Sequence, residues 1–327
     1  MNFAIIGCGL IGEKRAKALQ ATGHRVRVVA DTVGSRAERL ASLCDGSLPS
    51  TDWRSAVSSQ DVHAVIVATT NRSLAPVTVE AVGQGKHVIV EKPVGRTVAE
   101  IDTVISAACK AGVHVQVGFN HRYHPSLQRA RELVDSGALG PLLFIRGRYG
   151  HGGRVGYEKE WRSDPEISGG GELIDQGVHL IDLARWFLGD FTQVDGHTHT
   201  YFWRMPVDDN AFVSLRTPSN QTAWLHVSCT EWKNMFSFEV YGRDGKIDIQ
   251  GLGGSYGVER LALYRMQAQM GPPETTIWEY PGEDKSWQSE TADFIRSVEL
   301  GVDRGPTLHD ARAVLEVVES IYRQSLQ

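Results

Sequence analysis

The sequence has few cysteines, and their positions exclude two kinds of stabilising cross-link. The four cysteines among 327 residues are far apart, with no C-x-x-C pair and no His-x-His cluster near them. Disulfide frameworks and structural zinc sites need patterned, closely spaced ligands. We therefore expect reduced thiols, no metal site and a cytoplasmic location.

A long apolar run and an excess of positive charge are also missing. No stretch approaches the ~20 apolar residues that span a bilayer. The apolar residues 3–12 lack a preceding basic segment, and charged residues 13–15 stand where a signal peptide would have its cleavage site. The net charge is −5, so there is no surplus of lysine and arginine to neutralise phosphates. We expect no membrane segment, no signal peptide and no nucleic-acid partner.

Length and patterning predict two globular domains. Hydrophobic residues make up 41% and charged residues 22% of the chain, close to the globular average. In residues 1–121, short apolar strands alternate with helices of about ten residues, which is typical of βαβ crossovers and a parallel sheet. In residues 122–327, strands follow one another across turns such as 218–220 and 243–245, which is typical of hairpins. This second part predicts an antiparallel sheet with helices on one face, closed by a helix over residues 307–324 that we expect to pack back on the first domain.

A glycine-rich turn predicts a dinucleotide site. Residues 7–12 form GxGxxG between a strand and a helix: Gly7 allows the tight turn, Gly9 lets the backbone approach a pyrophosphate, and Gly12 lets helix and strand pack closely. Asp31 ends the second strand, where it accepts hydrogen bonds from ribose hydroxyls and repels a 2′-phosphate. This favours NAD over NADP, although nearby Arg36 complicates the preference; the alternative is a glycine turn without a cofactor. The predicted contacts here are Gly7, Gly9, Leu10, Ile11, Gly12 and Asp31.

A second motif, Glu91-Lys92-Pro93, stands at the carboxyl end of a predicted strand. Ligands of open α/β sheets collect at these strand ends. A lysine beside a nicotinamide can hydrogen-bond a substrate hydroxyl and stabilise an alkoxide as hydride leaves. The alternative is a surface lysine that caps a strand end.

A third motif follows the glycine triplet at residues 169–171. If residues 172–187 form one helix, Asp175, His179 and Asp182 share an arc of about 60° on one face. A histidine with nearby carboxylates is what proton transfer at neutral pH requires. The alternatives are metal ligands, for which the spacing offers too few groups, and a satisfied polar network at a domain boundary.

Together these motifs resemble the Gfo/Idh/MocA family of oxidoreductases over nearly the whole chain. Further matching segments are residues 68–71, 85–93 and 118–122. The resemblance implies an α/β protein: a Rossmann doubly wound parallel sheet, then an α+β domain with a large, mostly antiparallel open sheet. It also implies NAD(P)-dependent hydride transfer at a secondary alcohol or ketone of a sugar, nucleotide sugar or cyclitol, and a homodimer or homotetramer formed through the open sheet.

The resemblance also assigns roles to individual residues. It implies that Lys92, Asp175 and His179 are catalytic and meet the substrate beside the nicotinamide. It adds Thr69, Asn71, Glu91 and Lys92 to the cofactor contacts. Many relatives have Pro-Asn-x-x-His after the third strand, whereas this sequence has Thr70 and Leu74 in place of the proline and histidine. That departure puts the cofactor contacts there in doubt, but not the fold.

A glycine-containing loop, residues 151–162, leads into the third motif. Its basic residues, Arg154, Lys159 and Arg162, predict binding of an anionic group, and Tyr157 or Trp161 is placed to stack on a sugar. The alternative is a solvated loop whose Trp161 packs on the domain. The predicted substrate contacts are Asn120, Arg122, Trp161, Arg162, Asp175 and His179.

Three questions stay open at the level of sequence. The general base is His179, or Lys92 if burial favours its neutral form. Some proteins of this family bind the dinucleotide only as a regulatory ligand, which the presence of Lys92, Asp175 and His179 argues against. Others use NAD transiently to assist glycosidic bond cleavage, which predicts that NADH does not accumulate.

Overall fold

The computed structural model describes residues 1–325, which divide into two compact units. Unit 1 contains Met1–Asn120, Glu166–Gly169 and Trp287–Leu315. Unit 2 contains His121–Pro165, Gly170–Ser286 and the chain from Glu316 onward. The sequence predicts one division after residue 121, whereas the structure groups two later segments with unit 1.

Unit 1 is built on a six-stranded parallel sheet in the order β3-β2-β1-β4-β5-β6. This is the strand order of a doubly wound dinucleotide-binding sheet, so the predicted Rossmann fold is confirmed. All four residues of β4 are buried, as expected for a strand covered on both faces. The strands are β1 (Asn2–Ile6), β2 (Arg25–Ala30), β3 (Leu48–Ser50), β4 (Ala64–Val67), β5 (His87–Glu91) and β6 (Val115–Gly118).

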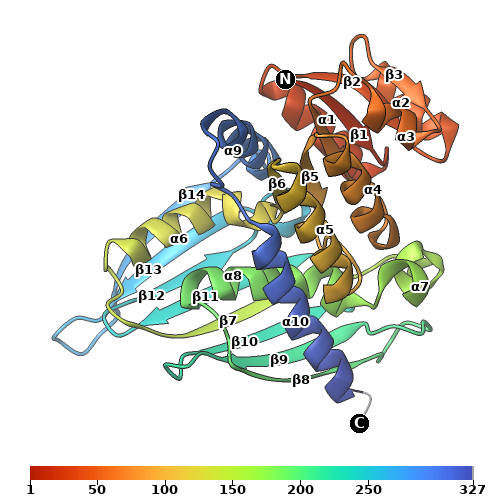
Figure 1. The fold of residues 1–327 in the computed structure, drawn as a ribbon. Coiled ribbons are helices and arrows are strands. Elements are labelled where there is room, and N and C mark those ends of the chain that lie inside the picture. The colour runs from red at the N-terminus through yellow and green to blue at the C-terminus, as the bar shows by residue number, and fades with distance from the viewer. Residues whose placement is uncertain (326–327) are drawn as a thin grey trace. The chain divides into compact units, whose positions relative to one another are not determined.

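Helices connect these strands, and α9, which is far from them in the sequence, completes the core of unit 1 (Figure 1). Phe294 of α9 is fully buried, and its ring centroid lies 6.3 Å from that of Phe3 in β1. Neither α9 nor the short elements β3 and α3 are predicted from the sequence. The helices are α1 (Leu10–Ala21), α2 (Gly34–Ser42), α3 (Trp53–Ser58), α4 (Asn71–Gly83), α5 (Val98–Ala111), α7 (Pro165–Ser168) and α9 (Ser286–Leu300).

Arg15 of α1 is completely buried between two carboxylates of unit 1. Its Nε donates to Oε1 of Glu91 at 2.8 Å, and its Nη1 donates to Oε2 of Glu290 at 2.5 Å. Its guanidinium carbon also lies 4.6 Å from the centroid of the Trp287 ring. One cation therefore joins α1, the carboxyl end of β5 and α9.

Unit 2 is built on an eight-stranded sheet in the order β14-β13-β12-β11-β7-β10-β9-β8. Among the described strands of this sheet, only β7 and β10 pair in parallel, so the predicted large, mostly antiparallel sheet is confirmed. The turn at 218–220 joins β9 to β10, and Asn220 takes the left-handed φ of 63° that such a turn needs. The strands are β7 (Leu142–Gly150), β8 (Gln193–His199), β9 (Asn210–Arg216), β10 (Thr222–Ser228), β11 (Met235–Gly242), β12 (Lys246–Gln250), β13 (Glu259–Arg265) and β14 (Glu274–Tyr280).

Helices α6 (Pro125–Asp135) and α8 (Val178–Leu188) lie on one face of this sheet (Figure 1). Gly147 of β7 allows close packing, because a Cβ there would lie 3.3 Å from a methyl carbon of Leu180. On β10, alternate residues are buried, whereas Trp224, which points to the other face, is 64% exposed. Assembly of a dimer or tetramer through that open face stays a prediction.

The helix expected over residues 307–324 is present as α10 (Leu308–Ser325). It begins with a capping box: Thr307 N–H donates to Oδ2 of Asp310, and Asp310 N–H donates to Oγ1 of Thr307. The part of α10 up to Leu315 belongs to unit 1, and the part from Glu316 belongs to unit 2.

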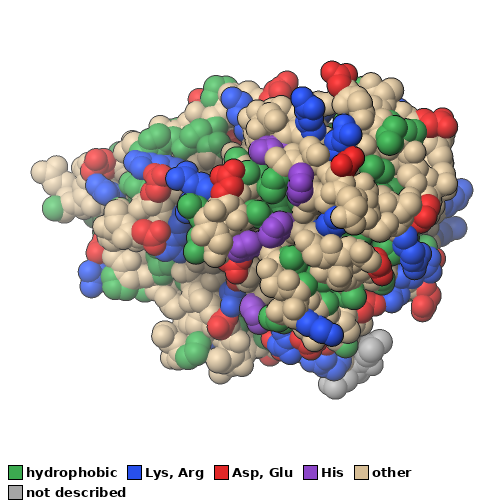
Figure 2. All heavy atoms as spheres, turned by 45° about the horizontal axis from the view of Figure 1, so that its top comes forward, with side chains coloured by type: hydrophobic (Ala, Val, Ile, Leu, Met, Phe, Trp, Pro, Cys, Tyr) green, Lys and Arg blue, Asp and Glu red, His purple; other side chains and the backbone are tan. Residues whose placement is uncertain are grey.

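The surface carries both signs of charge. Acidic and basic side chains are interspersed over the face drawn in Figure 2. Within residues 1–325, no helix combines the length and the apolar composition that crossing a bilayer requires. The predictions that nucleic acid is not a partner and that the protein is cytoplasmic stay predictions.

Replacing Arg15 with methionine should destabilise unit 1, because it removes the cation that two buried carboxylates share. Breaking a buried ion pair from one side costs about 3–5 kcal/mol. Urea unfolding followed by circular dichroism measures the loss, and Lys17→Met, an exposed position on the same helix, should change the free energy of unfolding by less than about 0.5 kcal/mol. Equal stability of the two variants would contradict the central role of Arg15.

Candidate active site

The turn between β1 and α1 excludes side chains at two glycines and leaves space at the third. A Cβ on Gly7 would lie 2.2 Å from the carbonyl oxygen of Ala68, and one on Gly12 would lie 2.1 Å from that of Gly7. A Cβ on Gly9 would meet no atom within 4 Å, and Gly9 is the N-cap of α1. The turn therefore fits a pyrophosphate that approaches at Gly9 and the helix N-terminus. Leu10, which is exposed, and Ile11, which is half-buried, form the first turn of that helix.

Asp31 ties the end of β2 to this turn. Its Oδ2 accepts the N–H of Cys8 at 2.9 Å, and its Oδ1 accepts the N–H of Val33 at 2.9 Å. Burial, with the nearby Asp31 charge, raises the pKa of the Cys8 thiol to about 12, so this cysteine remains a thiol at neutral pH. Asp31 is half-buried, and its predicted contact with the ribose stays a prediction.

Asn71, a predicted cofactor contact, has a partner that the sequence analysis does not predict. Its buried side-chain amide donates to the carbonyl oxygen of Ser168 at 2.8 Å. Arg96 donates to the carbonyl oxygen of Glu166 at 2.6 Å. These bonds, both within unit 1, hold the segment that directly precedes the glycine triplet. Cofactor contacts from Asn71 and the half-buried Thr69 stay predictions.

Glu91 is the last residue of β5, and Lys92 and Pro93 follow it in a tight turn. The Glu91 carboxylate is bound by Arg15, so we interpret Glu91 as a support for the strand end; its predicted contact with the cofactor stays a prediction. The peptide bond from Lys92 to Pro93 is cis, and the N–H of Val94 donates to the Glu91 carbonyl oxygen at 3.0 Å. Lys92 is half-buried.

The segment after the glycine triplet differs from the single helix expected over residues 172–187. Leu173–Gly177 forms a π-helical turn, and α8 begins at Val178. Because a π-turn has wider residue spacing than an α-turn, the expected common arc for Asp175, His179 and Asp182 does not apply. Each of the three side chains instead has its own partner. Such π-turns are frequent at functional sites.

Asp175 joins two other predicted substrate contacts. Its Oδ2 accepts from Nε of Arg162 at 2.9 Å, and the guanidinium carbon of Arg162 lies 4.6 Å from the centroid of the Trp161 ring. The charge of Asp175, with lesser contributions from neighbouring groups, raises the pKa of Arg162 against the effect of burial. The structure thus brings Trp161, Arg162 and Asp175 together in unit 2.

His179 lies against a second histidine that the sequence analysis does not assign to the site. The ring of His121 stacks on that of His179 with centroids 3.9 Å apart and an interplanar angle of 22°. Tyr149 of β7 contacts the His121 ring edge-on at 5.0 Å. Both imidazoles are at most 5% exposed. The spacing of residues 121–124 after β6 gives no sign of this stacking, because it depends on α8.

Asp182 forms a buried ion pair with Arg122, whereas Asp175 pairs with Arg162. Nε of Arg122 donates to Oδ2 of Asp182 at 2.8 Å, and the Asp182 side chain is 1% exposed. The alternative interpretation of this motif, a satisfied polar network, therefore fits Asp182. Substrate contact by Arg122, and by the buried Asn120 that begins the 3₁₀ helix Asn120–Tyr123, stays a prediction.

Glu172 and His151 are a further pair that the sequence motifs do not predict. Oε2 of the buried Glu172 lies 3.6 Å from Nε2 of His151. Burial alone would lower the His151 pKa, but Glu172, with a smaller contribution from Asp175, raises it above the ordinary value. Since Glu172 directly precedes the π-turn, this pair attaches the loop at 151–162 to the start of the helix.

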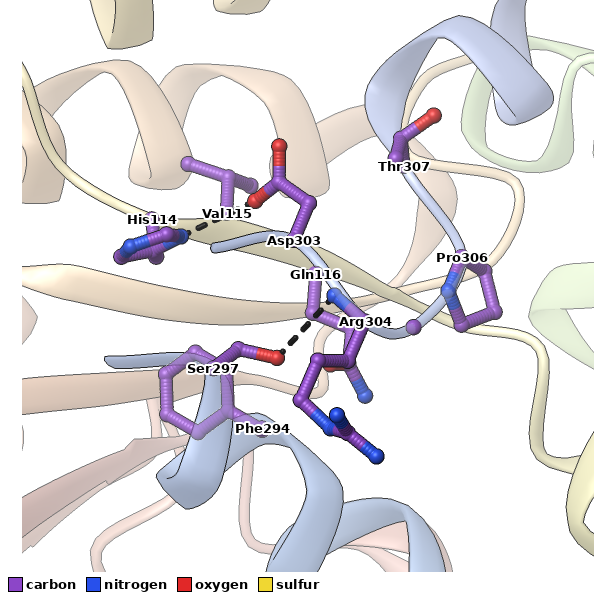
Figure 3. A pocket seen from close by; sticks show the side chains of 10 residues that line it. His114, Val115, Gln116, Phe294, Ser297, Asp303, Arg304, Pro306 and Thr307 are labelled. Carbon is purple, nitrogen blue, oxygen red and sulfur yellow. Dashed lines mark hydrogen bonds and ion pairs between the residues drawn. The ribbon is translucent and has the colours of Figure 1, made fainter. Parts of the chain in front are cut away.

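The pocket drawn in Figure 3 is not a substrate site. It lies in unit 1 between β6 and the segment that joins α9 to α10, and it holds about 10 Å³, enough for one water molecule. An ion pair between His114 and Asp303 and a hydrogen bond between Arg304 N–H and Ser297 Oγ fix its walls. Within residues 1–325, no cluster of three or more His, Cys, Asp or Glu side chains is placed to hold a metal.

Two family models match the chain. The model described as "Oxidoreductase family, NAD-binding Rossmann fold" matches residues 1–119, and that of the GFO/IDH/MocA C-terminal domain matches residues 127–248. The chain belongs to the GFO/IDH/MocA family. The resemblance inferred from the motifs is confirmed, and so are NAD as the cofactor and the class of enzyme, an NAD-dependent oxidoreductase that acts on a CH–OH group.

The similarity to named relatives extends over nearly the whole chain. Levoglucosan dehydrogenase of Pseudarthrobacter phenanthrenivorans is 24% identical over 99% of this chain and 97% of its own. Inositol 2-dehydrogenase 2 of Saccharopolyspora erythraea is 27% identical over 98% of this chain and 91% of its own. A solved complex of levoglucosan dehydrogenase with NADH has a TM-score of 0.91 and 23% identity, covering 100% of this chain and 97% of that one. The last comparison shows the shared fold.

Replacing Gly9 with valine should block the cofactor without harming the fold, because a Cβ there meets only open space. We expect NADH affinity, measured by fluorescence titration, to fall about tenfold or more, equivalent to about 1.4 kcal/mol. Gly83→Val, another position where a Cβ has no neighbour within 4 Å, should bind NADH normally. Unchanged affinity in Gly9→Val would place the cofactor elsewhere.

Proposed function

We propose that the enzyme transfers hydride between NAD and a secondary alcohol or ketone of a neutral sugar or cyclitol. The observation that supports this most directly is the cluster on the π-turn and α8, in which buried His179 and Asp175 are fixed by His121 and Arg162. The relatives named above are dehydrogenases of levoglucosan and of inositol, both polyhydroxylated rings.

In the proposed mechanism, His179 takes the proton of the reacting hydroxyl. A neutral imidazole is suited to this near pH 7, and stacking on His121 fixes the plane of its ring. The Lys92 ammonium donates to the same oxygen and stabilises its developing negative charge. Bound NAD supplies the acceptor for the hydride.

Asp175 orients the remaining hydroxyls of the substrate in this proposal. Its Oδ2 accepts from Arg162, which fixes the carboxylate. Carboxylate and guanidinium groups side by side offer acceptors and donors to neighbouring hydroxyls. Trp161, beside Arg162, offers an apolar face to the C–H groups of a ring.

The charge balance of the loop favours a neutral substrate over the anionic one that its basic residues predict. Arg154 is paired with Glu160 at 2.6 Å, and Arg162 with Asp175 at 2.9 Å. Each arginine thus already has a carboxylate partner, and Lys159 is exposed. A uronate or a nucleotide-sugar diphosphate would have to compete with these carboxylates. We therefore favour uncharged sugars and cyclitols within the predicted substrate class.

His179→Asn should lower kcat by about 10²–10⁴-fold, the usual contribution of a general base, and leave NADH affinity unchanged. Turnover is followed by NADH absorbance with inositols, aldoses and levoglucosan. His309→Asn, an exposed histidine on α10, should match the wild type in both measurements.

Two results would contradict this proposal. Near-normal turnover of His179→Asn would remove His179 from the mechanism and favour Lys92 as the base. Release of reducing sugar from a glycoside without accumulation of NADH would favour NAD-assisted glycosidic cleavage.

A further inference from the structure

Unit 2 contains a cavity of about 410 Å³ that the proposed mechanism does not use. Ligand pockets typically measure about 300–1,000 Å³, so the space is ample for one sugar ring. It lies where the loop after β7, the loop after β8 and the loop after β10 come together. We call it the aromatic pocket; its lining is Gly152, Arg154, Val155, Gly156, Glu158, Phe202, Trp203, Thr230 and Trp232.

Three aromatic rings form one wall of the aromatic pocket. The ring centroid of Phe202 lies 5.5 Å from that of Trp232 and 5.0 Å from that of Trp203. Trp232 is 82% exposed and Phe202 is 54% exposed, so large apolar faces remain open. Nε1 of Trp203 donates to the carbonyl oxygen of Cys229 at 2.9 Å, which fixes the orientation of that ring.

The loop that carries two of these rings is held by a single carboxylate. Asp209 accepts the backbone N–H groups of Tyr201, Phe202 and Trp203 at 2.7–3.0 Å. Hydrogen bonds with these groups and with Asn210 lower the pKa of Asp209 against the effect of burial, so it stays charged. The rings are therefore presented by an anchored loop.

Backbone features of the neighbouring loops also fit a preformed binding site. Trp232 has φ of 60°, a strained conformation that bulky residues seldom adopt and that is enriched at functional sites. A Cβ on Gly152 would lie 2.7 Å from the Trp232 carbonyl carbon, and one on Gly153 would lie 2.4 Å from Cζ2 of Trp203. Glycine at both positions lets the loop after β7 pack directly under the aromatic wall.

A chain of charged side chains connects the aromatic pocket to Asp175. Nη2 of Arg154, which lines the pocket, lies 2.6 Å from Oε1 of Glu160. Oε2 of Glu160 lies 3.8 Å from Nη1 of Arg162, and Nε of Arg162 lies 2.9 Å from Oδ2 of Asp175. A ligand at Arg154 is therefore in the same polar network as the carboxylate proposed to orient the substrate.

We infer that the aromatic pocket binds a second sugar ring, so that the substrate is a neutral disaccharide or a related glycoside. The inference rests on the proposed function and specifies its substrate class. A pyranose with equatorial hydroxyls presents C–H groups on its faces, which suit the exposed rings of Phe202 and Trp232. Its hydroxyls suit the side chains of Thr230 and Glu158 at the rim, and the paired charges of Arg154 and Glu160 leave no surplus for an anion.

The test compares cellobiose with glucose, its one-ring counterpart, by isothermal titration calorimetry on the enzyme with NADH. The wild type should bind cellobiose about tenfold or more tightly than glucose. Trp232→Ala and Phe202→Ala should each remove about tenfold of that affinity and leave glucose and NADH binding unchanged. Tyr201→Ala is the matched control, because Tyr201 is in the same anchored loop and 62% exposed but does not line the pocket.

The possible failures can be told apart. Cellobiose that binds no more tightly than glucose, or that is weakened equally by Tyr201→Ala, overturns the inference. A change of sedimentation coefficient in Trp232→Ala with sugar affinity intact also overturns it, and assigns this wall to contact between copies of the chain. Cellobiose that binds in the pocket while no tested sugar reduces NAD would instead contradict the proposed function.

Discussion

The ion pair between Arg162 and Asp175 is the contact on which the arrangement of the proposed substrate site in unit 2 depends. It fixes the loop at 151–162 against the π-turn, which places a ring, a cation and a carboxylate side by side. Without it, Trp161 and Arg162 would lose their direct contact with the π-turn. Glu172 with His151, one turn earlier, gives the same loop a second attachment.

Carboxylates act throughout this protein as anchors for backbone and for arginines. Glu91 binds Arg15 directly before the turn that contains Lys92, and Asp31 accepts two N–H groups beside the glycine turn. In unit 2, Asp208 accepts the N–H groups of Gly171 and Leu173 at the start of the π-turn, while Asp209 anchors the aromatic loop. Because these two aspartates are adjacent, one short segment positions both the helix start and the pocket wall.

What the sequence predicts well is what depends on neighbouring residues. The strand, glycine turn and helix over residues 2–21 follow from local apolar pattern and steric limits, and Gly7, Gly9 and Gly12 have the spatial environments that their spacing predicts. The missed features depend on distant partners. Arg15 meets Glu290 across 275 positions, and the π-turn at Leu173–Gly177 leaves no distinct mark in an otherwise ordinary helical pattern. Periodicity alone therefore predicts a common face for Asp175 and Asp182, although they bind different arginines.

The same distinction explains why the reaction class is easier to infer than the substrate. The motifs that predict cofactor binding and proton transfer, residues 7–12 and 175–179, each lie within a few positions, so their chemistry is visible as spacing. The aromatic pocket combines residues from three loops, around 152–158, 202–203 and 230–232, and no one of these segments has a recognisable pattern. Selectivity for a ring depends on the distances between such loops, which are set by strand pairing in the sheet. A change of strand register or loop anchor would therefore alter the substrate while leaving every motif of the reaction intact.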